Sequence, residues 1–182
     1  MARRRAAELA VADRVNFRHG DAGTFLADRR VDVAACIGAT WIGGGVTGTI
    51  DLLERSLRPG GMLLIGEPYW RSDPPDQAAV EACHAQSRDD FSDLPGLVGL
   101  FHQHGWDLVE MVLADGDSWD RFAAAHWLTI RRWLDENPDD ELAPAFREEL
   151  INDPLGHVRY RREYLGWGVF ALLKSSAVRG RR

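Results

Sequence analysis

Short apolar runs alternate with helix-like segments along most of the chain, and this alternation limits the folds that are open to it. The run from Val31 to Ile37 is almost continuously apolar, as are residues 62–65 and 165–173, which is typical of strands buried on both faces of a sheet. Between residues 50 and 57 the apolar side chains recur at the helical spacing instead. Strands that alternate with helices form mostly parallel sheets, so the pattern predicts an α/β fold.

The other elements follow from the same reasoning. Val15 to His19 alternates apolar and polar side chains, which favours a strand, and residues 106–113 are also strand-like. Helices are expected at 2–11, 22–28, 50–57, 74–87, 94–104 and 117–136, then near 139–151 and 154–163, with Asp73, Asp93 and Asp117 opening three of them. The segment at 175–182 reads as a disordered tail.

Composition narrows the classes of function. The 182 residues suffice for one domain, and the net charge of -6 gives no general basic field for nucleic acid. Two cysteines without a CxxC pattern suggest neither a disulfide framework nor a metal site, and a cytoplasmic location is the default. Residues 33–50 carry no charge, but they are too rich in glycine and threonine to be read as a membrane span.

The order of these segments resembles class I S-adenosylmethionine-dependent methyltransferases. The family's third helix and strand resemble RAAELAVADRVNFRHGDA, and its fourth strand and following loop resemble VDVAACIGATWIGGG. Its fifth unit, with an L-x-PGG turn, resembles TIDLLERSLRPGGMLLIGEPYW, and its last two strands resemble WDLVEMVLAD and YLGWGVFALLK. The resemblance covers about residues 2–174 and implies a Rossmann-like sheet whose last strand is antiparallel.

The chain departs from the family at its start. Members begin with a strand that ends in a G-x-G turn for the cofactor, followed by a strand that ends in an acid for the ribose. Neither is found here, and Gly43 to Gly45 follows the fourth strand, so it is no substitute. We therefore expect an N-terminally truncated domain at 1–174, with a sheet that lacks the first two strands. Residues 31–37 would then form an exposed apolar edge that could support a homodimer.

The resemblance implies S-adenosyl-L-methionine as cofactor and indicates which residues contact it. Asp21 stands where the family contacts the adenine amino group, with Ala22 beside it. Ile37, Gly38 and Ala39 follow the fourth strand, where the family contacts the adenine ring and the methionine part. From the residues alone, Asp21 is equally expected to cap a helix, and Gly38 to provide a tight exit from the strand.

Four further side chains are expected just past the carboxyl ends of strands, where ligands bind in open α/β sheets. Trp41, Tyr69 and Trp70 are predicted to bind the acceptor, and Glu67 is a candidate general base. The alternative for the aromatic residues is ordinary packing. The alternative for Glu67 is a cap or a salt bridge.

The segment between the last two strands, residues 117–164, is long for such a connection. In the family this connection leaves from the carboxyl edge, so we expect a helical cap over the cofactor side. Trp119 and His126 from this cap are predicted to bind the substrate, although His126 could also be a core histidine. Arg161 and Arg162 read as exposed helix charges.

The predicted function is therefore methyl transfer from S-adenosylmethionine to a small-molecule acceptor. Such a transfer needs a donor and an acceptor held in line and shielded from water, with no metal and no protein nucleophile. Because the strongest cofactor contacts of the family are missing, we expect the chain to be weak or inactive alone. The alternative is a non-catalytic remnant or an interaction module derived from a methyltransferase.

Overall fold

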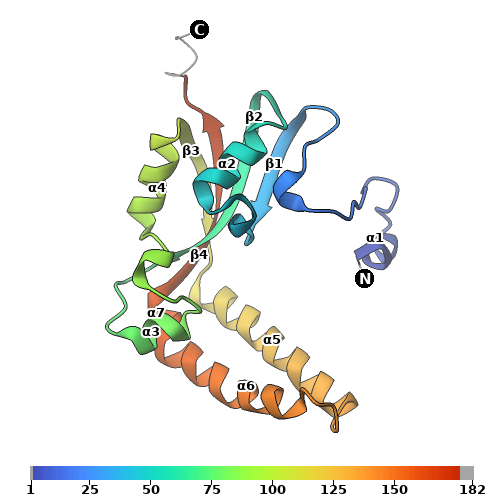
Figure 1. Ribbon diagram of the computed structural model, residues 1–182, viewed down its shortest axis with the longest axis vertical. Helices are drawn as coiled ribbons and strands as arrows, with labels where there is room; N and C mark the ends of the chain where they lie inside the picture. The colour runs from blue at the N-terminus through green and yellow to red at the C-terminus, as the bar shows by residue number, and fades with distance from the viewer. Residues whose placement is uncertain (1, 177–182) are drawn as a thin grey trace.

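The computed structural model describes residues 2–176, and within them four strands form one sheet (Figure 1). In the order in which they lie side by side, the strands are β1 (Val31–Ile37), β2 (Leu57–Trp70), β4 (Leu165–Lys174) and β3 (Trp106–Leu113). β1 and β2 are parallel, and β4 is antiparallel to both β2 and β3. β3 therefore runs with β1 and β2. The Rossmann-like sheet with an antiparallel last strand is therefore confirmed.

The helices connect these strands. They are α1 (Ala2–Glu8), α2 (Val46–Glu54), α3 (Gln77–Ala82), α4 (Leu94–Gln103), α5 (Gly116–Glu136), α6 (Ala143–Gly156) and α7 (Arg162–Tyr164). Short turns of 3-10 helix are η1 (Ala22–Thr24), η2 (Thr40–Gly43) and η3 (Arg88–Asp90), and η4 (His157–Arg161) is π-helical. The predicted N-cap Asp93 is confirmed, whereas the caps of α3 and α5 are Asp76 and Asp115 instead of Asp73 and Asp117.

The main core lies between the sheet and two helices. Leu63 and Ile65 of β2 and Phe170 of β4 are fully buried against Ile50 of α2 and Phe101 of α4. The Phe101 and Phe170 rings contribute a tilted aromatic pair, with centroids 5.4 Å apart. Because α2 and α4 cover the same face, the central strands β2 and β4 are fixed in place from one side.

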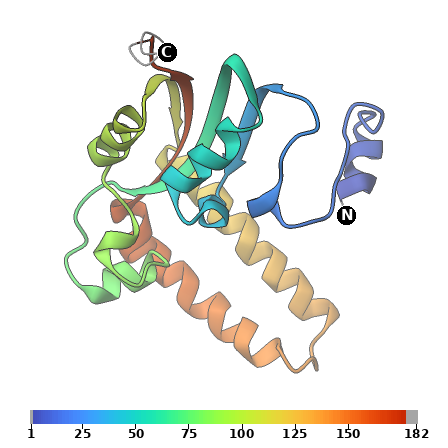
Figure 2. The ribbon, with the colours of Figure 1, turned by 45° about the horizontal axis from the view of Figure 1, so that its top comes forward.

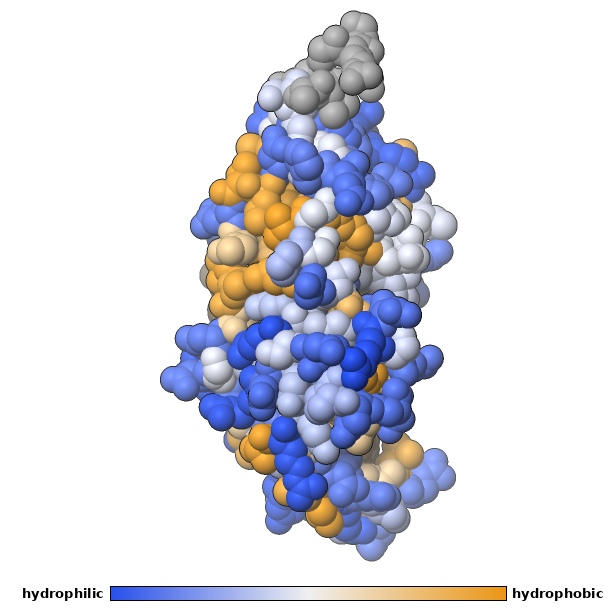
Figure 3. Space-filling model, turned by 90° about the vertical axis from the view of Figure 1, so that its left-hand side faces the viewer, coloured by the Kyte–Doolittle hydropathy of each residue, from blue (hydrophilic) through white to orange (hydrophobic). Residues whose placement is uncertain are grey.

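The opposite face of the sheet carries apolar side chains that remain accessible. Val33 and Ile37 of β1 and Val112 of β3 are exposed there. Figure 3, which looks at the molecule from the side of α4 and β3, shows apolar surface gathered at the level of the sheet. β1 pairs with β2 along one side, and no other strand in residues 2–176 pairs with its free side. The predicted exposed edge at residues 31–37 is therefore present.

The N-terminal part differs from the prediction. Residues 15–19 form no strand, and the predicted helix at 22–28 is only the short turn η1. In Figures 1 and 2 the segment runs as a loop that carries α1 away from the sheet. The Arg3 guanidinium bonds to the Phe17 carbonyl oxygen at 3.0 Å, and Arg18 pairs with Asp28. An alternating pattern alone does not make a strand, because its backbone groups need a neighbouring strand.

The insert between β3 and β4 is a helical hairpin that leaves from the carboxyl edge of the parallel strands (Figure 2). β3 ends at Leu113, and β4 begins at Leu165, which pairs with Trp70 at the end of β2. The two helices predicted at 139–151 and 154–163 form one continuous helical run from Ala143 to Tyr164. Pro154 lies inside this run, and the π-helical turn η4 follows it.

Two residues of the tail predicted at 175–182 lie within the described chain, and the first of them is part of the fold. Ser175 is buried, its backbone N–H donates to the Gly105 carbonyl at 2.9 Å, and its hydroxyl contacts Asp107 at 2.6 Å. Residues 177–182, the rest of the predicted tail, lie outside the described residues. Of the helices that the structure describes, none combines the length and the hydropathy needed to span a membrane.

The free edge of β1 leads to a prediction on self-association. We expect the chain to associate through this edge at high concentration, because exposed apolar edge strands pair with one another. A lysine in place of Val33 should keep the chain monomeric, whereas Val15→Lys, an equally apolar and exposed position outside the sheet, should not. Sedimentation velocity over a concentration series measures this. A wild-type chain that stays monomeric throughout would contradict the expectation.

Candidate functional site

The exit of β1 is tightly built around Gly38. Gly38 has a φ of +70°, and its N–H donates to the Gly66 carbonyl at 2.9 Å. A Cβ on this residue would lie 3.0 Å from the Trp167 ring of β4. The left-handed backbone and this close approach both favour glycine. The structure therefore shows the tight strand exit that was one reading of Gly38, with Ile37 and Ala39 on either side.

Asp21 and Ala22 lie beside this exit. Turn η1 packs so closely on η2 that a Cβ on Gly23 would lie 2.8 Å from the Ile42 carbonyl oxygen. One Asp21 carboxylate oxygen accepts the Gly23 N–H at 2.9 Å, which is the predicted capping role. The other oxygen makes no hydrogen bond to the described residues. Trp41 of η2 is 77% exposed nearby, so the η1–η2 pair presents both a free acceptor and an uncovered aromatic ring.

Glu67 connects β2 to η2, which follows the same exit. The Thr40 hydroxyl donates to its carboxylate at 2.8 Å, and the Thr49 hydroxyl donates to the Thr40 carbonyl at 2.7 Å. Burial raises the pKa of Glu67, and the hydrogen bond from Thr40 opposes part of that rise. These contacts are those of a side chain that positions η2.

Glu67, Tyr69 and Trp70 were predicted to lie past the end of a strand, and this placement was wrong. The strand was expected to end at residue 65, but β2 continues to Trp70 because it pairs with β4 along that whole length. Tyr69 is 4% exposed and Trp70 is 7% exposed. The Trp70 indole N–H donates to the Arg88 carbonyl at 2.7 Å. Packing, the alternative reading, is what the structure shows for both aromatic residues.

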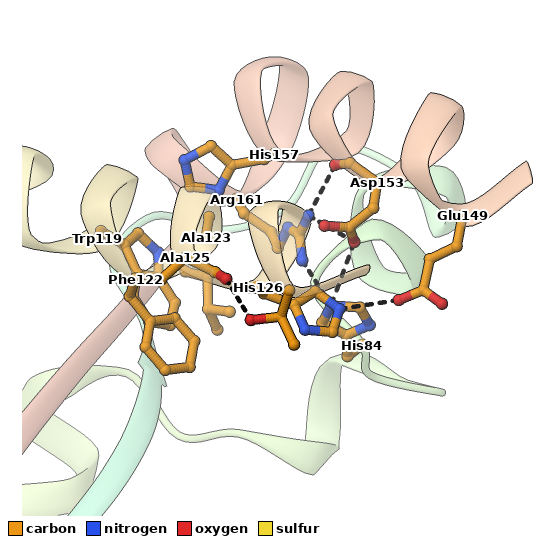
Figure 4. Close-up of a pocket in the computed structure, with 12 residues that line it drawn as sticks. His84, Trp119, Phe122, Ala123, Ala125, His126, Glu149, Asp153, His157 and Arg161 are labelled. Atoms are coloured by element: carbon orange, nitrogen blue, oxygen red, sulfur yellow. Dashed lines mark hydrogen bonds and ion pairs between the residues drawn. The ribbon is translucent and has the colours of Figure 1, made fainter. Parts of the chain in front are cut away.

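A cavity of about 490 Å³ opens between α5, α6 and the end of α3 (Figure 4). Its wall includes Leu165, the first residue of β4, so the cavity reaches the carboxyl edge of the sheet. Trp119 and His126, both predicted to bind the substrate, line it. Figure 4 shows an aromatic end, formed by Trp119 and Phe122, and a polar end where His84, His126, Glu149, Asp153 and Arg161 gather.

A buried ion pair organises the polar end. Arg161 is only 7% exposed, so the expectation that it is a surface charge was wrong, whereas Arg162 is exposed as expected. Arg161 Nη2 lies 2.7 Å from Asp153 Oδ1 and 2.7 Å from the Asp153 carbonyl oxygen. The Trp127 indole N–H also donates to Asp153, at 2.6 Å. Burial alone would raise the pKa of Asp153, but these hydrogen bonds and the guanidinium charge outweigh it and lower the pKa.

Two histidines at this end have assignable protons. Arg161 Nη1 lies 2.6 Å from His84 Nε2, and a guanidinium can only donate, so His84 Nε2 is the acceptor. Burial and the Arg161 charge lower the pKa of His84, which keeps its ring neutral. His126 Nε2 lies 2.9 Å from Glu149 Oε1. Because the ionised carboxylate only accepts, His126 Nε2 is the donor of this contact, and in the neutral ring the lone pair then lies on Nδ1.

The aromatic end is a stacked pair. The Trp119 and Phe122 rings are 5.5 Å apart and inclined by only 14°. Phe122 is 68% exposed, which is unusual for a large apolar side chain that lines a cavity. The buried residues of α5 are Ala123, Ile130 and Leu134.

Sequence reasoning missed four of the lining residues although a signal was present. Glu149, Asp153, His157 and Arg161 are spaced four residues apart and therefore lie on one face of a helix. The predicted break at Pro154 hid this face. Residues 2–176 contain no group of three or more acidic, histidine or cysteine side chains that could hold a metal ion.

Comparisons with known proteins place this geometry among solved structures. No protein-family model matches the chain. A SAM-dependent methyltransferase from Geobacter sulfurreducens, crystallised with S-adenosyl-L-homocysteine, is 60% identical with a TM-score of 0.92, over 95% of this chain and 70% of that one. Its counterpart from Thiobacillus denitrificans, also with S-adenosyl-L-homocysteine, is 57% identical with a TM-score of 0.91, over 95% and 70%.

A third relative has a solved structure but no described activity. The uncharacterized protein YjhP of Escherichia coli (strain K12) is 56% identical over 172 residues, which are 94% of this chain and 69% of that protein. Its X-ray structure gives a TM-score of 0.90. The shared fold and sequence therefore extend over nearly all of this chain.

The buried position of Glu67 leads to a prediction on pH and stability. Its pKa is higher in the folded protein than the ordinary 4.5, so the folded state holds a proton that the unfolded chain releases. The contribution of Glu67 to the free energy of unfolding should therefore fall as the pH rises above about 4.5. Glu67→Gln lacks this titration, and its amide oxygen can still accept from Thr40. The variant should gain stability relative to the wild type as the pH rises.

Urea denaturation at about pH 4.5 and about pH 7 measures the difference between the two proteins. Glu110→Gln, at an exposed position of β3, serves as the matched control and should track the wild type. If Glu67→Gln loses stability with rising pH in parallel with the wild type, burial of Glu67 is not the source of the slope.

Proposed function

The chain belongs to the family of S-adenosylmethionine-dependent methyltransferases, and from this premise we propose that it transfers the methyl group of S-adenosyl-L-methionine to a small-molecule acceptor. The observation that carries the proposal is the 60% identity to a solved methyltransferase that binds S-adenosyl-L-homocysteine, the product left by the donor. When bound, the donor supplies an electrophilic methyl group on a sulfonium sulfur. The protein has to bind, orient and shield the two reactants.

The residues at the β1 exit suit the adenine side of the donor. The unbonded carboxylate oxygen of Asp21 can accept a hydrogen bond from an adenine amino group, and Ala22 lies beside it. The exit formed by Ile37, Gly38 and Ala39 has a left-handed glycine at its centre, which brings bare backbone close to a ligand. These five residues therefore fit the cofactor contacts that the family resemblance implies.

The cavity in the helical hairpin suits the acceptor. Its volume of about 490 Å³ falls in the range of small-molecule pockets, roughly 300–1,000 Å³. It has an apolar wall with a few convergent polar groups, as such pockets usually do. Leu165 lines it at the carboxyl edge of the sheet, the edge to which the β1 exit also belongs. We propose that Trp119 and His126 contact the acceptor there, and that Glu67 acts by holding Thr40 and η2 in place.

We further propose that the 182-residue chain binds the donor weakly by itself. Asp21 and the Gly38 exit account for the adenine side alone, and no G-x-G-x-G turn is present for the methionine part. Hydrogen bonds to charged groups contribute about 1.5–3 kcal/mol each, so lacking two or three of them weakens binding by about three orders of magnitude.

Calorimetric titration of the purified chain with S-adenosyl-L-methionine tests both proposals. We expect a dissociation constant well above the micromolar range, and a further loss in Asp21→Ala. Asp13→Ala, an exposed aspartate in the loop after α1, is the matched control and should change nothing. Micromolar affinity that Asp21→Ala abolishes would contradict the weak binding but keep the donor site. No binding at any concentration would favour an interaction module over an enzyme.

A further inference from the structure

We infer that the cavity between α5 and α6 takes an acceptor with an ammonium group on an apolar, ring-sized body. This inference rests on the proposed function, because it names the class of molecule that is methylated. The polar end of the cavity would hold the ammonium group, and the Trp119–Phe122 pair would cover the apolar body (Figure 4).

The charges on the cavity wall favour a cation. The charge of Arg161 is neutralised by Asp153, with 2.7 Å between Nη2 and Oδ1. His84 is neutral, because its Nε2 accepts from Arg161. Glu149 is then the remaining acid of the wall, and within residues 2–176 its ionic partner is His126 alone. When the histidine rings of the wall are neutral, Glu149 leaves the wall with a net negative charge.

The same arrangement disfavours an anion. A carboxylate or phosphate is usually held by two parallel N–H groups of one guanidinium. The Nη1 and Nη2 atoms of Arg161 are already bound to His84 and Asp153. Only Nε has no partner among the described residues, and it is buried. An anionic acceptor would therefore meet Glu149 without a free bidentate cation to offset it.

His126 and Glu149 together present the acceptors that an ammonium group needs. Glu149 takes the Nε2 proton of His126 with one oxygen, Oε1, at 2.9 Å, and its other oxygen makes no hydrogen bond to the described residues. The lone pair on His126 Nδ1 is a second acceptor. The other titratable groups of the cavity wall are Glu149 and Asp153 from α6, His157 and Arg161 from η4, and His84 from the end of α3. An ammonium group donates up to three hydrogen bonds, so it can use both acceptors.

The aromatic end of the cavity is the reason to expect an apolar body on the acceptor. Phe122 is highly exposed while stacked on Trp119, so a ligand that covers it removes apolar surface from water. Ala123 and Leu165 continue the apolar wall between the two ends. An aliphatic ammonium without such a body would leave this surface uncovered.

Three probes of one shape and different charge test the inference. Phenethylamine, 2-phenylethanol and 3-phenylpropionate share a phenyl ring on a two-carbon arm and differ in their head group. Each is titrated at neutral pH into the full 182-residue chain, and affinities are read from amide and imidazole NMR shifts. We expect phenethylamine to bind about fivefold to tenfold tighter than the alcohol, with shifts at the cavity-lining residues, and the propionate to bind most weakly.

Matched variants test which residues cause the expected differences in affinity between the three probes. Glu149→Gln should remove the preference for phenethylamine and leave 2-phenylethanol unchanged, while Glu148→Gln, its exposed neighbour, should behave as wild type. Phe122→Ala should weaken all three probes by about fivefold, while Leu128→Ala, exposed on α5 outside the cavity wall, should not.

The inference is overturned if the propionate binds best, if amine and alcohol bind equally, or if Glu149→Gln keeps the preference for the amine. S-adenosyl-L-methionine is added to the same sample as a separate arm. If it shifts residues 37–39 while phenethylamine fails to bind, only the acceptor class is wrong. If neither compound binds, the ammonium inference and the proposed function fall together.

Discussion

The arrangement of this protein depends on one strand that runs against the others. β4 lies between β2 and β3 and is antiparallel to both, with Phe170 and Leu172 fully buried in the main core. An antiparallel strand must begin at the edge where its parallel neighbours end. The chain therefore has to stay at the carboxyl edge between Leu113 and Leu165, and the helical hairpin can be nowhere else. The cavity and the β1 exit share an edge for this reason.

A second constraint keeps the hairpin in shape. The buried pair of Arg161 and Asp153 joins η4 to α6, and further hydrogen bonds extend it to His84 after α3 and to Trp127 on α5. Breaking a buried ion pair by removing one partner leaves an uncompensated charge, at a cost of about 3–5 kcal/mol in typical cases. The guanidinium of Arg161, the one arginine among the residues that line the cavity, is occupied by this pair. The same contact that stabilises the hairpin thus leaves the wall with an excess of acid.

The sequence predicted correctly those elements that depend on the residues within them. Its predictions were wrong where contacts with distant segments determine the structure. The apolar run at 31–37 is a strand with the predicted bounds, although it is buried on one face and not on both. The alternation at 15–19 looked equally strand-like, but no strand pairs with it in the described chain. The second helix was predicted to begin anew at residue 154, but Pro154 lies inside α6 and the helical run continues through η4 to Arg161 on the cavity wall. The burial of Arg161, like the extension of β2 to Trp70, depends on segments far away in the sequence, which no local pattern reveals.

We propose that the methyl donor binds at the β1 exit, on the same edge as the cavity of the hairpin. Amide NMR shifts of the chain titrated with S-adenosyl-L-homocysteine test this directly, since NMR detects weak binding as well as tight binding. We expect the largest shifts at residues 21–24 and 37–40, with smaller ones at the cavity-lining residues of α5. Shifts centred on Gly60 and Gly61, which lie at the opposite edge of the sheet, would contradict it.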